Sequence, residues 1–104
     1  MKKIFLCCAA GMSTSMLVEK MKQSAVNRDI AVEITAVPVS DFEQIVTEAD
    51  VILLGPQVKF QLQNLSSAAA PHGVPVAAID MMLYGSMQGD KVLDQALSLL
   101  PNKQ

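Results

Sequence analysis

Four short apolar runs, separated by segments with helical spacing, constrain the fold of this chain more than any other feature of its sequence. The runs are residues 3–7, 31–37, 51–54 and 75–79. Short aliphatic runs of this kind are typical of strands that are buried on both faces of a parallel sheet. Parallel strands need crossovers, and the intervening segments can supply right-handed helical ones. The sequence therefore predicts an α/β fold with an open four-stranded parallel sheet and helices on both of its faces.

The predicted helices follow the strands in turn. The first has an apolar face formed by a set of residues at helical spacing, which are Met16, Leu17, Met21 and Ala25. A hydroxyl before it can cap its free N–H groups. Ser40 and Glu43 form the pattern of a capping box, which predicts a short helix after the second strand. Residues 57–69 and 90–100 are the remaining predicted helices.

Composition narrows the class of protein. The 104 residues fit one domain, residues 1–104, and 51% of them are hydrophobic against 17% charged, which excludes disorder. The net charge of −2 argues against a nucleic-acid partner. The apolar runs are too short to insert into a membrane. Two adjacent cysteines, Cys7 and Cys8, without others indicate free thiols and a reducing compartment, so we expect a cytoplasmic protein.

The position of the second cysteine suggests a ligand site. In open α/β sheets, ligands bind beyond the carboxyl ends of the strands, where the strand order reverses. Short connections permit the order 2-1-3-4, which places this reversal between the first and third strands. Cys8 and residues 55–57 would then face one crevice. Cys7 is expected to be the last residue of its strand and a buried core residue, because cysteine is often a small core hydrophobe.

The segment after Cys8 has the composition of an anion-binding loop. Small and hydroxyl-bearing residues lead into a helix N-terminus, where backbone N–H groups and the helix dipole favour an oxyanion. The same field favours the nucleophilic thiolate of a cysteine at its mouth. Cys8 is therefore the candidate nucleophile, and the candidate phosphate-binding residues are Ala9, Ala10, Gly11, Met12, Ser13, Thr14, Ser15 and, from the end of the third strand, Gln57.

Three stretches carry a resemblance to a known family. "CAAGMSTS" from Cys8 to Ser15 resembles the active-site loop of the enzyme IIB subunits of the bacterial phosphotransferase system, lactose/cellobiose/chitobiose class. "ADVILLGPQV" and "AIDMMLYGSMQG" agree with it, so the resemblance covers nearly the whole chain.

The resemblance implies a function. Cys8 would take a phosphoryl group from a phosphohistidine on a IIA protein and pass it to a sugar bound in the membrane subunit IIC. The sugar would be a β-linked disaccharide such as cellobiose, chitobiose or lactose. The chain would be a phosphotransferase that works without cofactor or metal, is a monomer when isolated, and reaches the inner face of the membrane only transiently through IIC.

Two enzymes with similar loops are the main alternative. Low-molecular-weight tyrosine phosphatases carry an arginine and a serine six and seven residues after the cysteine, where this chain has Thr14 and Ser15. An arginine there would clamp the transferring phosphoryl group. Its absence speaks against a phosphatase, and the lack of a well-spaced resolving cysteine speaks against an arsenate reductase. A small-molecule-binding module with an inert Cys8 is a third reading.

Other residues have both a functional and a structural interpretation. Gln57 can donate its amide to phosphate or simply begin a helix. Asp80 is expected mainly to cap the following turn, and Tyr84 to be an amphipathic packing residue near a short helix, although either can contact the loop or a partner. His72 precedes the fourth strand, away from the crevice, and is expected to be exposed. Several methionines are expected around Cys8, where together they would suit a protein that docks two partners, but for each one alone a position at the core edge is favoured: Met12, Met81, Met82 and Met87.

Overall fold

A parallel sheet forms the centre of the molecule. The computed structural model describes residues 2–8 and 15–100. Its strands are β1 (Lys2–Cys8), β2 (Val32–Pro38), β3 (Val51–Leu54) and β4 (Val76–Ala78). They pair in parallel in the order β2-β1-β3-β4. The predicted fold and strand order are confirmed.

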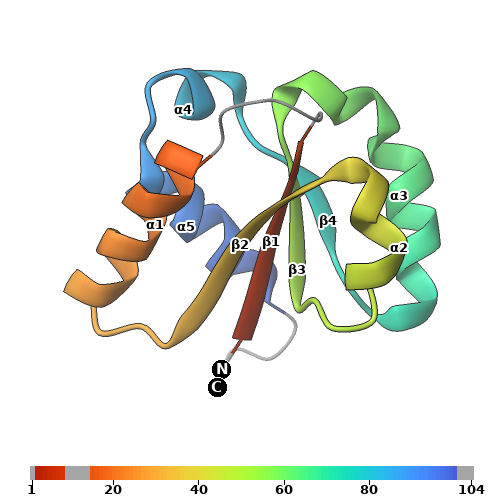
Figure 1. Ribbon diagram of the computed structural model, residues 1–104, viewed down its shortest axis with the longest axis horizontal. Helices are drawn as coiled ribbons and strands as arrows, with labels where there is room; N and C mark the ends of the chain where they lie inside the picture. Colours follow the sequence, from red (N-terminus) through yellow and green to blue (C-terminus); the bar gives the residue numbers. More distant parts are fainter. Residues whose placement is uncertain (1, 9–14, 101–104) are drawn as a thin grey trace.

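Helices cover both faces of this sheet (Figure 1). One side carries α1 (Ser15–Asn27), α4 (Met81–Gly85) and α5 (Gly89–Leu99), and the other carries α2 (Phe42–Ile45) and α3 (Leu62–Ala69). Three short 3₁₀ turns complete the described elements: η1 (Val39–Asp41), η2 (Pro56–Gln61) and η3 (Ala70–His72).

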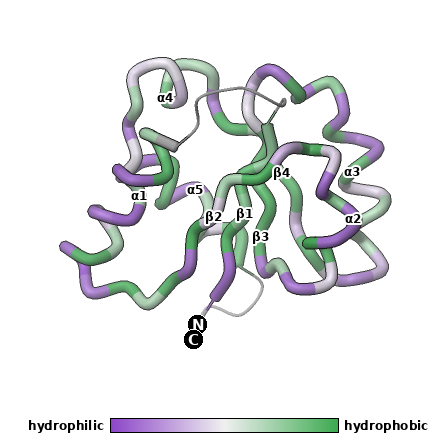
Figure 2. Tube along the Cα trace, in the orientation of Figure 1, coloured by the Kyte–Doolittle hydropathy of each residue, from purple (hydrophilic) through white to green (hydrophobic). Residues whose placement is uncertain are grey.

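The alternation of side chains along each strand divides the core into two halves. In β1, Ile4 and Leu6 pack with α1 and α5, whereas Phe5 and Cys7 pack with α2 and α3. Figure 2 shows that β1 and β3 are hydrophobic over most of their length. These two central strands are therefore buried on both faces, as their sequences predict.

The outer strands differ from that expectation, because each is only half-buried over most of its length. β4 has carbonyl groups on its open edge, and side chains from two helices reach them. Ser66 Oγ lies 3.5 Å from Val76 O, and Gln95 Nε2 donates to Ala78 O at 2.9 Å. Such contacts occupy an edge that could otherwise pair with another strand.

Three local predictions are wrong. Met16 is 58% exposed, so it does not belong to the buried face of α1. No side chain caps α2, whose N-cap is Asp41, because Ser40 lies inside η1 and the chain enters the helix through that turn. The helix expected over 57–69 is divided into η2 and α3, with non-helical angles at Val58.

Gly89 allows α1 and α5 to pack closely. A Cβ built on Gly89 would lie 2.7 Å from three atoms of α1, two of which are backbone atoms of Lys20 and Met21. Neither helix can yield without moving its backbone. We expect Gly89→Ala to lower the free energy of unfolding by about 1–3 kcal/mol, the usual cost of overpacking. Urea unfolding measures this, with Gly85→Ala as the control, because a Cβ on Gly85 meets nothing within 4 Å.

None of the helices in the described part of the chain has the length and apolar character needed to cross a membrane.

Candidate active site at the carboxyl end of β1

Cys8 lies at the carboxyl end of β1, where the strand order reverses. β1 continues one residue beyond its predicted end, and Cys8 pairs with Pro38 of β2. On its other side lies Gly55, which follows β3 and donates its N–H to Cys7 O at 2.8 Å. The predicted switch point between the first and third strands is therefore the place where Cys8 lies.

The thiol of Cys8 is largely covered. The residue is 6% exposed, and Sγ lies 3.8 Å from the carbonyl oxygen of Val37, a long contact for a thiol donor. Neither Cys8 nor Cys7 forms a disulfide. The alternation along β1 directs Cys8 to the side of α1 and α4, and directs Cys7 to the opposite core.

Cys7 is a core residue, as predicted. It is fully buried, and its pKa is raised from 9.0 to about 12. Burial is the largest cause, because desolvation disfavours the thiolate, and the negative charges of Cys8 and Asp41 add to it. Cys7 therefore remains a protonated thiol at neutral pH, and the two neighbouring cysteines occupy different chemical environments.

This shift predicts a loss of stability in alkali. Above pH 9.0 the unfolded chain releases the Cys7 proton, whereas the folded chain keeps it until about pH 12. The folded state then binds more protons, so the free energy of unfolding falls as the pH rises through this window. Serine does not ionise there, so the parent should lose stability relative to Cys7→Ser between pH 8 and pH 10.5. Urea unfolding at both pH values measures the difference, and a constant difference would contradict the shift.

Gly55 lies next to Cys8, and the Gln57 amide lies against Gly55. A Cβ built on Gly55 would lie 3.6 Å from Cys8 Cβ and 2.5 Å from Gln57 Oε1. Gln57 Oε1 is buried and has no hydrogen-bond partner within the described residues. The role of Gly55 was not predicted, although a glycine between a buried strand and "PQ" is a sequence signal of close approach.

Most of the predicted anion-binding loop lies outside the described residues. This applies to Ala9, Ala10, Gly11, Met12, Ser13 and Thr14. Ser15 begins α1, so a helix N-terminus follows Cys8 within seven residues. The end of β1 and the start of α1 therefore lie on either side of the predicted anion-binding segment.

Asp80 has a clear structural role. It is the N-cap of α4, and its Oδ1 accepts from Met82 N at 2.8 Å and Leu83 N at 3.3 Å. The predicted cap is therefore confirmed. Tyr84 is half-buried and packs against the core beside α1 and α5, which matches the packing expected of it.

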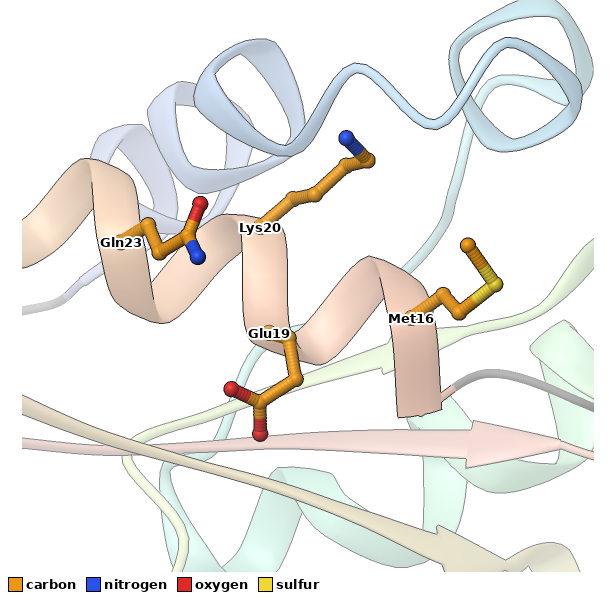
Figure 3. Close-up of a pocket in the computed structure, with 4 residues that line it drawn as sticks. All are labelled: Met16, Glu19, Lys20 and Gln23. Carbon is orange, nitrogen blue, oxygen red and sulfur yellow. The ribbon is translucent and has the colours of Figure 1, made fainter.

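Exposed apolar side chains lie on the elements around this end of the sheet. Met81 and Met82 of α4 are 61% and 80% exposed, so the core-edge interpretation is wrong for both. Met87 does pack against the core. Phe60 of η2 is 78% exposed. Met16 lines a shallow pocket of about 270 Å³ on α1 (Figure 3), together with Glu19, Lys20 and Gln23.

The remaining candidates lie elsewhere. His72 is exposed in η3, before β4, at the amino end of that strand, as predicted. In the described ranges, no group of three or more His, Cys, Asp or Glu residues could hold a metal ion.

The fold and the position of Cys8 define an α/β domain with a cysteine at the carboxyl end of its first strand, ahead of a helix N-terminus. A family model described as "PTS system, Lactose/Cellobiose specific IIB subunit" matches residues 3–95. The chain belongs to this family of phosphotransferase system IIB subunits. It is therefore a component of a phosphotransferase, as its sequence predicts.

Relatives with different sugar specificities are similar to this chain. The oligo-β-mannoside-specific EIIB component of Bacillus subtilis (strain 168) is 44% identical, with 99% of this chain and 100% of that protein covered. The cellobiose-specific component of Lactococcus lactis subsp. lactis (strain IL1403) and the galactose-specific component of L. lactis subsp. cremoris (strain MG1363) are each 43% identical, with 95% and 96% covered.

Solved structures have the same fold. The solution structure of a cellobiose-specific IIB component from Borrelia burgdorferi has a TM-score of 0.80 and 38% identity, with 99% of this chain and 94% of that chain covered. The lactose-specific IIB domain of Streptococcus pneumoniae has a TM-score of 0.85 at 21% identity, with 94% and 96% covered.

Proposed function

We propose that Cys8 is the phosphoryl acceptor of this chain, which receives the group from a phosphohistidine of a IIA protein and passes it to a sugar bound in the membrane subunit IIC. The observation that carries the proposal is the position of Cys8 at the switch point of a IIB-family domain, with α1 beginning at Ser15. The protein would work in the cytoplasm and meet the membrane only when IIC is bound.

The transfer consists of two displacements at phosphorus. The Cys8 thiolate attacks the phosphorus of the phosphohistidine, an S–P bond forms, and the P–N bond breaks as the imidazole leaves. A sugar hydroxyl then attacks the same phosphorus, losing its proton to a base in the acceptor complex. The S–P bond breaks and the thiolate is restored, so Cys8 is a covalent carrier without net change.

The phosphoryl group would be held mainly by backbone N–H groups. In this proposal the loop from Ala9 to Ser15 supplies those donors, the N-terminus of α1 adds partial positive charge, and Gln57 approaches from the end of β3. None of these groups carries a full positive charge. A phosphocysteine held in this way would be stabilised as a ground state without strong stabilisation of the transition state of its hydrolysis.

The exposed apolar side chains near Cys8 fit a surface that two proteins use in turn. Methionine adapts to differently shaped partners, and Met81 and Met82 lie in α4 at 61% and 80% exposure. Phe60 of η2 and Met16 of α1 are also exposed, at 78% and 58%. We propose that IIA and IIC contact these side chains when each brings its reacting atom to Cys8.

The sugar is proposed only as a class. The curated relatives named above are specific for an oligo-β-mannoside, cellobiose and galactose, and their identities to this chain differ by one percentage point. A β-linked disaccharide such as cellobiose, chitobiose or lactose agrees with the family description.

Intact mass spectrometry tests the proposal. Purified protein is mixed with a phosphorylated IIA protein of the same family class, and a gain of one phosphoryl group on Cys8 is expected. Incubation with p-nitrophenyl phosphate serves as the control for the phosphatase alternative. Steady release of p-nitrophenol, or the absence of phosphoryl transfer from IIA, would overturn the carrier function.

A further inference from the structure

The Gln57 side chain has a buried oxygen that lies against Gly55, the residue next to Cys8. Its Oε1 is buried, and no group in residues 2–8 and 15–100 donates a hydrogen bond to it. A buried carbonyl oxygen without a donor bears the full cost of its desolvation. Such an atom is rare in a folded protein and often marks a place where a ligand or another state supplies the partner.

Gly55 provides the space that this amide occupies. A Cβ on Gly55 would lie 2.5 Å from Gln57 Oε1, closer than real Cβ contacts allow. The backbone of Gly55 has φ −62° and ψ 154°, an ordinary extended conformation that any residue adopts. The backbone therefore does not require glycine here. A side chain at residue 55 would clash with Gln57. Its Cβ would lie 3.6 Å from Cys8 Cβ, which is an ordinary distance.

The chemistry of the site changes when a phosphoryl group arrives. Phosphoryl oxygens only accept hydrogen bonds, so an amide can bind them only through its N–H groups. A carboxamide also carries two N–H donors, and its terminal torsion has a broad, roughly two-fold profile, so the amide can turn by half a rotation. The buried position beside Gly55 then holds Nε2, and a phosphoryl oxygen becomes its partner.

We propose that Gly55 is a positioning residue for Gln57, and that the Gln57 amide turns when Cys8 is phosphorylated so that Nε2 donates to the phosphoryl group. This inference rests on the proposed function. It explains why the oxygen has no partner among residues 2–8 and 15–100, since the amide gains its partner when the phosphoryl group arrives. Gln57 thereby shifts the exchange of the phosphoryl group with the donor toward phosphocysteine.

The first test observes the amide directly. In ¹⁵N-labelled protein, the side-chain N–H signals of Gln57 are those that Gln57→Ala removes. We expect them to shift when phosphorylated IIA loads Cys8, and to exchange more slowly with solvent, while the signals of the exposed Gln63 stay in place. A merely structural Gln57 would leave its own signals unmoved. Unmoved signals in a parent shown by mass to carry phosphoryl would overturn this inference alone.

The second test uses the equilibrium of phosphoryl exchange with IIA. Loss of one hydrogen bond to a charged group should lower this equilibrium constant about tenfold in Gln57→Ala. Gly55→Ala should lower it by a similar factor, because the new methyl group displaces the amide. Gln63→Leu and Gly85→Ala are the matched controls, since Gln63 is exposed and Gly85 has open space around it.

The double variant separates positioning from general damage. When residue 57 is alanine, the methyl group that Gly55→Ala adds has no amide to displace. The double variant should therefore have an equilibrium constant no lower than that of Gln57→Ala alone. Additive losses would mean that Gly55→Ala disturbs Cys8 itself and would overturn the positioning role. A parent that takes no phosphoryl from IIA would instead overturn the proposed function, and this inference with it.

Discussion

Phosphoryl transfer from IIA is expected to vanish in Cys8→Ser while the protein stays folded. Serine keeps the shape of the cysteine but replaces a polarizable sulfur with a hydroxyl, which is a much weaker nucleophile. The expected loss is at least about a thousandfold, the scale seen when a covalent nucleophile is removed. Intact mass after incubation with phosphorylated IIA measures it, and circular dichroism confirms folding.

Cys7→Ser is the matched control, because it makes the same chemical change one residue away. Cys7 is fully buried on the opposite side of the sheet, so the variant should retain transfer. It buries a hydroxyl in an apolar core and should lose about 1–3 kcal/mol of stability. Equal loss of transfer in the two folded variants would remove the distinction between the cysteines.

Thr14→Arg is expected to convert the carrier partly toward a phosphatase. The variant places a guanidinium six residues after Cys8, where tyrosine phosphatases have theirs. Bidentate hydrogen bonds to the equatorial oxygens stabilise charge that develops in the transition state, so phosphocysteine should hydrolyse at least about tenfold faster. Vanadate should also bind more tightly. Thr14 lies outside the described residues, so this expectation rests on the sequence.

Phosphoprotein half-life and vanadate affinity measure the effect in folded parent and variant. Thr14→Gln is a suitable control, because it adds length and hydrogen-bond donors without charge. An unchanged lifetime together with unchanged vanadate affinity in Thr14→Arg would mean that Thr14 does not face the phosphoryl group. The loop would then have to be assigned differently.

The central strands could be predicted from the sequence because they are buried on both faces, whichever elements cover them. β3 lies where its apolar run predicts it, at residues 51–54, since a strand buried on both faces must be apolar throughout. α5 differs from its predicted range by one residue at each end, because its apolar spacing is regular. The cap at Asp80 could also be predicted, because a carboxylate before a helical turn accepts hydrogen bonds from N–H groups only a few residues away in the chain.

Elements whose form depends on packing were predicted less well. The apolar residues of η2 and α3 follow one helical spacing, which predicts a single helix. Val58 is buried where the chain leaves β3, and its backbone angles are not helical. The pattern of Ser40 and Glu43 matches a capping box, but η1 brings the chain into α2 from another direction. Local sequence patterns do not contain these approach angles.

The sequence by itself determined the parallel α/β sheet and the separation of Cys7 from Cys8, and it made Cys8 the candidate nucleophile. Strand periodicity directs neighbouring residues to opposite faces, and this does not require coordinates. The sequence also placed residues 55–57 near Cys8, but only the tertiary structure decided how they meet: Gly55 lies next to Cys8, and the Gln57 amide lies against Gly55. Gly55 and Gln57 are some fifty residues away in the chain. The pairing of β1 with β3 brings them to its side, because parallel register places the carboxyl ends of both strands at one edge of the sheet.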